Sequence, residues 1–238
     1  EHKYVLHVHS ISSLANVIYE DSFSILKNQL KENFCYVPYA RPGMPLTIEI
    51  RKKINESNQN IIFLENHGLI ISDDNLIKAF DLLNKIHNNL DKVLFEEDII
   101  NKSVFENKIK HYNYLDDSKF DIFKSQNNDL YNIFSKSFYP DHVIFLGPGL
   151  PCFENYKEAN IFIEKLNFNN ISIPPYLIIK SIGLFVSEKS NSISLEMLEC
   201  FVEFLKRFNL SKSYKYLSNQ QENELLNWDA EKYRQSIN

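Results

Sequence analysis

Apolar and polar positions alternate at the start of the chain and then recur at helical spacing. Residues 3–9 (KYVLHVH) alternate and are rich in β-formers, which predicts a strand. Residues 11–32 carry apolar side chains at helical spacing, which predicts a helix with a break near Asp21. The stretch 35–46 contains three prolines and a glycine, which is typical of a short strand running into a rigid loop. A further helix is expected over 47–56.

From residue 61 onward the pattern predicts strand pairs that are each followed by a long helix. The segment 61–72 (IIFLENHGLIIS) indicates two short strands, and a helix follows. The segment 174–187 (PPYLIIKSIGLFVS) indicates a second strand pair, followed by an amphipathic helix over 192–208. Both pairs carry a Gly-Leu dipeptide at the turn, so the two segments form a candidate internal repeat in which Ile182 corresponds to His67.

The remaining second half contains weaker signals. The apolar run at 142–149 (HVIFLGPG) predicts a strand that ends in a turn, and 158–168 predicts a short helix. Ser218 and Gln221 form a capping box that opens the last helix. This alternation of strands and helices predicts a layered α/β fold with helices packed on a mixed sheet.

Composition narrows the class of protein. The chain has 238 residues, of which 44% are hydrophobic, and a formal charge of −5, which excludes intrinsic disorder and gives no basic field for nucleic acid. No apolar run approaches the roughly 20 residues that a membrane-spanning helix needs. The five glycines form neither a P-loop nor a dinucleotide-binding motif. The three cysteines are widely spaced and include no CxxC pair, which indicates a reducing cytoplasm.

Three histidines carry the chemistry that the pattern indicates. His7 and His9 lie two residues apart on a predicted strand, so their side chains share a face. His67 lies in the predicted turn between Asn66 and Gly68. Three imidazoles around one ion leave a coordination position open, as in catalytic zinc sites, where the metal acts as a Lewis acid on a carbonyl or enolate oxygen. The alternative is that the HxH pair arises by chance in an unrelated α/β protein.

Three segments together resemble the class II aldolase/adducin family. They are LHVHS (6–10), VPYARPGMPL (37–46) and FLENHGLIISDDNLIKAF (63–80), which follow the family order of an HxH strand, a PYxxxG loop and an NHG turn before a helix. The resemblance implies a three-layer αβα domain with a mixed central sheet, plus a smaller α/β C-terminal lobe. It also implies that the three histidines bind Zn²⁺ or another divalent metal.

The resemblance further implies a function. It implies a metal-dependent aldehyde-lyase that cleaves a carbon–carbon bond of a sugar phosphate, or a related hydroxy-carbonyl compound, through a zinc-stabilised enediolate. An epimerase or decarboxylase of the same family, or a non-catalytic adducin-like binding module, is the alternative. Ser10, Tyr39 and Arg41 match positions near the substrate, although the loop that holds Tyr39 and Arg41 is also explained as a proline-held turn. The family further implies a homo-oligomer.

Two departures from the family leave the catalytic group unassigned. The family's catalytic acid and phosphate-binding segments lie upstream of the HxH pair, in a region that would precede Glu1. The stretch 26–31 contains no tyrosine, whereas the family's aldolases take one there from a neighbouring subunit. We therefore expect residues 1–95 to be the C-terminal portion of the family domain, 96–137 a helical connector, and 138–238 an α/β lobe that is a candidate degenerate repeat.

Overall fold

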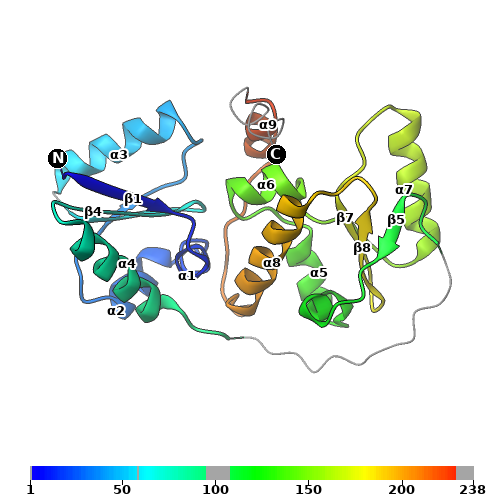
Figure 1. Ribbon diagram of the computed structural model, residues 1–238, viewed down its shortest axis with the longest axis horizontal. Helices are drawn as coiled ribbons and strands as arrows, with labels where there is room; N and C mark the ends of the chain where they lie inside the picture. Colours follow the sequence, from blue (N-terminus) through cyan, green and yellow to red (C-terminus); the bar gives the residue numbers. More distant parts are fainter. Residues whose placement is uncertain (1, 58, 95–107, 229–238) are drawn as a thin grey trace. The chain divides into compact units, whose positions relative to one another are not determined.

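The computed structural model describes residues 2–57, 59–94 and 108–228 (Figure 1). The chain divides into two compact units, and each is built from segments that are far apart in the sequence. The first unit comprises Glu1–Phe95, Phe138–Pro140 and Glu203–Leu225, and the second comprises Glu96–Ser137, Asp141–Val202 and Leu226–Asn238. Of the expected connector over 96–137, residues 96–107 lie outside the described residues.

A mixed four-stranded sheet forms the centre of the first unit. Its strands are β1 (Tyr4–Val8), β2 (Cys35–Val37), β3 (Ile61–Leu64) and β4 (Gly68–Asp73), arranged in the order β1-β4-β3-β2. β4 pairs antiparallel with both β1 and β3, and β2 pairs parallel with β3. The two strands predicted over 61–72 and the strand predicted at the start of the chain are therefore confirmed.

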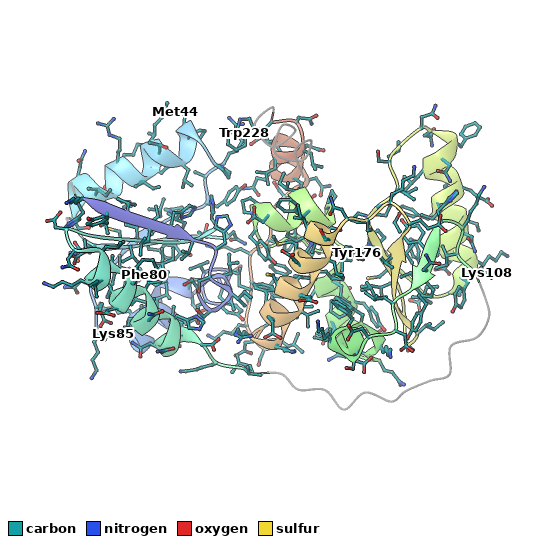
Figure 2. The ribbon with its side chains drawn as sticks, viewed as in Figure 1. Met44, Phe80, Lys85, Lys108, Tyr176 and Trp228 are labelled. Carbon is teal, nitrogen blue, oxygen red and sulfur yellow. The ribbon has the colours of Figure 1, made fainter. Side chains whose placement is uncertain are left out.

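Helices cover both faces of this sheet (Figure 1). The helices of the unit are α1 (Ile11–Leu14), α2 (Ser22–Gln29), α3 (Met44–Glu56), α4 (Leu76–Leu90) and all but the last residue of α9 (Asn219–Leu226). Successive strand side chains point to opposite faces. Ile62 and Leu64 accordingly pack with Leu46 of α3, whereas Ile61 and Phe63 pack with residues of α2 and α4. Met44 of α3 and Phe80 of α4, both labelled in Figure 2, are exposed.

The second unit contains a sheet of the same topology. Its strands are β5 (Tyr112–Tyr114), β6 (Cys152–Phe153), β7 (Tyr176–Ile179) and β8 (Gly183–Ser187), arranged in the order β5-β8-β7-β6. The other elements in this part of the chain are η1 (Ser118–Lys124), α5 (Asn128–Phe134), α6 (Pro140–Leu146), α7 (Tyr156–Phe168) and α8 (Ser192–Lys206). Tyr176 of β7 is fully buried, and its hydroxyl lies 3.1 Å from Ser194 Oγ (Figure 2).

The two sheets match in register as well as in strand order. Ile61 pairs with Ile71 in the first hairpin, and Tyr176 pairs with Val186 at the same point of the second. Each hairpin closes on a glycine, which pairs with the last residue of the preceding strand. In both sheets the outer parallel strand pairs with the first hairpin strand. The likeness visible in the sequence therefore extends to strand direction and pairing.

One predicted strand is wrong. The run over 142–149 is mostly helical, because it falls in α6 (Pro140–Leu146). A short continuous apolar run does not distinguish a strand from a buried helix, and Val143 and Leu146 are fully buried here. Pro140 opens the helix, where its fixed φ and missing N–H are favourable. That proline was the local signal for a helix.

Most other elements agree with the pattern. Ser218 N donates to Gln221 Oε1 at 2.8 Å and Gln221 N donates to Ser218 Oγ at 3.3 Å, which is the reciprocal capping box predicted for the last helix. The mixed α/β class is confirmed, with two mixed four-stranded sheets and surrounding helices. Throughout the described ranges, no helix has the length and hydrophobicity needed to cross a membrane.

His142 makes the stability of the second unit sensitive to pH. The imidazole is completely buried beside the ring of Phe201, and burial lowers its pKa to about 3. The unfolded chain therefore binds a proton near pH 6.5 that the native state excludes until about pH 3. Its contribution to stability is complete above pH 6.5 and is lost as the pH falls.

We expect the wild-type protein to lose stability on acidification relative to His142→Leu, which has no proton to bind. The difference between the two should approach about 1.4 kcal/mol per pH unit below pH 6. Urea unfolding at several pH values between 7 and 4 measures it. Parallel curves for the two proteins would contradict this account, whatever their absolute stabilities.

Candidate functional site

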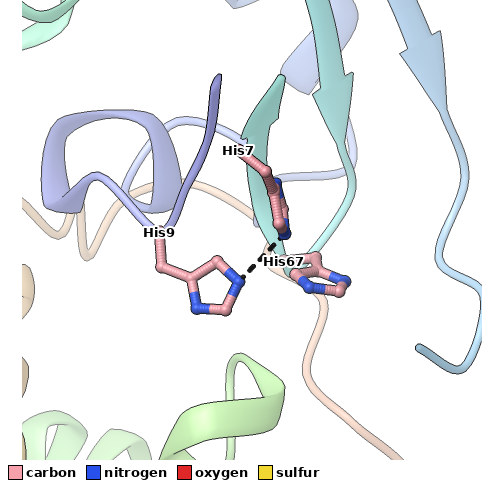
Figure 3. Close-up of side chains that lie close together, drawn as sticks. All are labelled: His7, His9 and His67. Carbon is pink, nitrogen blue, oxygen red and sulfur yellow. Dashed lines mark hydrogen bonds between the residues drawn. The ribbon is translucent and has the colours of Figure 1, made fainter. Parts of the chain in front are cut away.

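The three predicted histidines come together at one end of the first sheet (Figure 3). His7 lies in β1, His9 follows the end of that strand, and His67 lies in the turn between β3 and β4. One ring nitrogen from each residue lies within 4.8 Å of the others. Ring centroids are 4.9–5.3 Å apart, so the imidazoles face a common point.

Strand pairing explains why residues so distant in sequence meet. β1 pairs with β4 so that His7 lies opposite Ile70 and Val8 lies opposite Leu69. Continuing this register places His9 beside the turn that precedes β4, which is where His67 is found. His7 and His9 lie two residues apart along an extended chain, so their side chains share a face.

The turn itself depends on unusual backbone angles. Asn66 has φ 51° and Gly68 has φ 151°, and His67 N donates to Leu64 O at 3.1 Å. A Cβ atom at residue 68 would lie 2.5 Å from Val8 O and 3.2 Å from His9 Cδ2. Only glycine therefore lets the end of β1 approach the turn this closely. Asparagine is among the few other residues that tolerate positive φ.

The hydrogen bond of His7 defines its tautomer. Nδ1 lies 3.2 Å from the carbonyl oxygen of Leu69, and a carbonyl can only accept. Nδ1 therefore carries the proton, and Nε2 keeps its lone pair directed at the other two rings. A backbone carbonyl that orients a histidine in this way is the usual outer partner of a metal ligand.

The distances and burial suit a metal ion. His7 Nε2 and His9 Nε2 are 3.3 Å apart, joined by the dashed line in Figure 3. In a tetrahedral zinc site, with Zn–N bonds of about 2.0–2.1 Å, two nitrogen ligands lie roughly 3.3 Å apart. His67 is buried, His9 is half-buried and His7 is exposed, so the cluster is open on one side. The donor set fits a three-histidine centre with a free coordination position.

The predicted substrate positions lie around the same strands. Ser10 is the N-cap residue that precedes α1, and its Oγ lies 2.8 Å from Ser12 Oγ. Tyr39 N donates to Glu65 Oε2 at 3.1 Å, and the Tyr39 hydroxyl is buried. Burial, supported by the Glu224 carboxylate and opposed by Arg41, raises the pKa of Tyr39 to about 12. Its phenol therefore remains protonated near neutral pH and acts only as a neutral polar group.

Glu65 and Lys215 are site residues that the sequence pattern did not reveal. The Glu65 carboxylate, two residues before His67, accepts hydrogen bonds from Tyr36 Oη at 3.2 Å and from Lys215 Nζ at 2.6 Å. Its acidic side chain between an apolar strand and a turn was a weak local signal. Lys215 lies 150 residues further on and had no signal, because its role arises only from folding.

The equivalent position in the second unit carries different chemistry. Tyr114 pairs with Phe185 at the register point that His7 occupies opposite Ile70, so Tyr114 replaces His7. Two residues further on, Asp116 replaces His9, and Ile182 replaces His67 in the turn. Lys124 Cγ lies 3.1 Å from where a Cβ of Gly183 would be. Among the described residues, the one group of three such side chains close enough to hold a metal ion is His7, His9 and His67 of the first unit.

Comparison with known proteins assigns the N-terminal part of the chain to a family. Residues 1–91 match the family model described as the class II aldolase and adducin N-terminal domain. The resemblance inferred from the HxH, PYxxxG and NHG segments is therefore confirmed for these residues. No curated protein and no solved structure matches the chain.

Proposed function

We propose that this protein is a metal-dependent aldehyde-lyase of the class II aldolase type. The proposed reaction is cleavage of a carbon–carbon bond in a sugar phosphate or a related hydroxy-carbonyl compound. The single observation that carries the proposal is the convergence of His7, His9 and His67 with one open side, inside a domain of this family. Zn²⁺ is the metal that this donor set favours.

The residues of the chain supply binding and orientation. His7, His9 and His67 would hold the metal, and the Leu69 carbonyl keeps the His7 lone pair directed inward. When bound, Zn²⁺ would act as a Lewis acid toward a substrate carbonyl oxygen. Arg41 carries a permanent positive charge suited to a substrate phosphate. We leave the proton-transferring group unassigned among the residues that the structure describes.

Ser10 and Tyr39 complete the proposed substrate surface. Ser10 directly follows His9 in the chain, and the protonated Tyr39 phenol can donate a hydrogen bond to a substrate oxygen. An epimerase or decarboxylase would use the same metal centre, because each reaction develops charge on an oxygen beside the reacting carbon. A non-catalytic adducin-like module is the remaining alternative, and retention of all three imidazoles favours the enzyme.

We propose a domain organisation in which the second unit is a degenerate repeat of the first. Shared strand order and hairpin register support it, as does loss of all three histidines at the equivalent positions. The proposal keeps a three-layer αβα arrangement for residues 1–95. The described part of the expected connector instead supplies β5, η1 and α5 to the second unit, and Phe138–Pro140 and Glu203–Leu225 of the expected lobe join the first unit. We further propose that the protein is a cytoplasmic homo-oligomer that acts on a small molecule.

We expect the full chain to bind about one Zn²⁺ ion, since only the first unit supplies three imidazoles among the described residues. Chelation of the metal should lower the melting temperature, because saturating a site at 100 times its Kd stabilises by about 2.7 kcal/mol. Elemental analysis and thermal unfolding with and without a chelator measure both effects. A panel of sugar phosphates then tests for carbonyl cleavage products. A chain that binds zinc but turns over no member of the panel would favour the binding module.

A further inference from the structure

A late segment of the chain is hydrogen-bonded to the turn that carries His67 and to the stretch that follows α1. Residues 207–217, here called the 207–217 segment, belong to the first unit although the family match ends at residue 91. Lys215 N donates to Ile18 O at 2.6 Å, in the stretch that follows α1. Lys215 O accepts from Asn66 Nδ2 at 3.0 Å, immediately before His67.

Asn66 is the centre of these contacts. Its side chain is buried, and its amide nitrogen donates to Phe138 O at 2.8 Å as well as to Lys215 O. Its backbone N–H donates to Val17 O at 3.3 Å. Both side-chain N–H groups of Asn66 thus donate to carbonyl oxygens of segments that are remote in the sequence. These bonds hold Asn66, the residue before His67, in one orientation.

Glu65 adds a charged anchor on the other side of Asn66. Its side chain is only 11% exposed and accepts from Lys215 Nζ at 2.6 Å. The same carboxylate accepts from Tyr39 N and Tyr36 Oη on and after β2. The Lys215 side chain is 42% exposed, so the pair is half-buried, and its charge-assisted bond is stronger than a neutral hydrogen bond. The turn that carries His67 is therefore fixed at two successive residues by Lys215.

The second unit shows that the turn does not need these bonds to adopt its shape. Ser181 and Gly183 occupy the positions of Asn66 and Gly68 and have φ 59° and 128°. A serine hydroxyl has a single hydrogen to donate, so it cannot bridge two carbonyls as Asn66 does. The backbone conformation is common to both turns, whereas the double amide bridge accompanies the turn that carries a histidine.

We infer that Asn66 and Lys215 are positioning residues for His67. They hold its imidazole at the separation from His7 and His9 that a metal ion requires, and the N-terminal family domain depends for this on the 207–217 segment. The inference rests on the proposed metal site. Asn66 and Lys215 would act as outer-shell partners of the metal ligands, and loss of such partners typically lowers metal affinity by about 10–100-fold.

The test uses the full chain and measures zinc affinity by competition with a chromophoric chelator, well below the melting temperature of each variant. Asn66→Ser copies the second unit and removes one donor, and we expect its Kd for Zn²⁺ to rise about tenfold or more. Lys215→Met should raise the Kd severalfold, and Lys215→Arg, which keeps the charge, should restore it. The visible spectrum of Co²⁺-loaded Asn66→Ser should also differ from that of the wild type, because it reports ligand geometry.

Lys212→Met is the matched control. Lys212 lies in the same segment and pairs with Asp21 at 2.7 Å, but it contacts neither Glu65 nor Asn66. We expect its zinc affinity to equal that of the wild type. Wild-type affinity and an unchanged Co²⁺ spectrum in both Asn66→Ser and Lys215→Met would overturn the inference while leaving the metal site intact. If Asn66→Ser does not fold, the zinc affinities of Lys215→Met and Lys215→Arg test the inference instead. A wild-type chain that takes up no zinc would overturn the metal site and this inference together.

Discussion

His9→Ala is expected to lose tight zinc binding. The substitution leaves two imidazoles of a three-histidine group whose ligand atoms lie within 4.8 Å of one another. A ligand contributes more than an outer-shell partner, so the loss of affinity should exceed the 10–100-fold typical of such partners. Elemental analysis after gel filtration should find wild-type protein carrying zinc and His9→Ala carrying almost none. Any lyase activity should fall in parallel.

His2→Ala is the control for this prediction. His2 is also a histidine of the first unit, and its Nε2 lies 2.9 Å from Asn60 Oδ1 instead of facing the cluster. Its zinc content should match that of the wild type. Equal zinc in wild type and His9→Ala would disprove the metal site that we propose.

Gly68→Ala should both destabilise the first unit and weaken metal binding. A methyl group there would lie 2.5 Å from the backbone oxygen of Val8, so β1 and the turn must separate. The φ of 151° adds strain for any residue with a Cβ. Together we expect a loss of about 2–5 kcal/mol in the free energy of unfolding. The displaced turn would also move His67 away from His9.

Gly147→Ala separates the clash from the backbone strain. Gly147 has φ 90°, but a Cβ there meets nothing within 4 Å. The variant should therefore lose only the part of the free energy of unfolding that comes from the backbone angle. Urea unfolding and zinc titration of both variants measure the difference. Equal destabilisation in the two proteins, with wild-type zinc affinity in Gly68→Ala, would refute the close-approach argument.

The sequence was most informative where a feature depends on neighbouring residues. Alternation predicted β1, the Asn66–Gly68 turn separated β3 from β4, and the Ser218–Gln221 capping box forms as expected. The same local reasoning failed at α6, because an apolar run of that length suits a strand or a buried helix equally well. The signal that separates the two, Pro140 at the first position of the helix, lies just before the apolar run.

For the site, the sequence by itself determined which three imidazoles were candidates and which family the N-terminal part resembles. It did so because the HxH spacing, the NHG turn and their order can be read directly from the amino-acid sequence. Only the tertiary structure decided that His7, His9 and His67 meet, since that depends on the pairing of β1 with β4. It also assigned Lys215 and Phe138 to the first unit, because contacts between segments so far apart in the sequence exist only after the chain has folded.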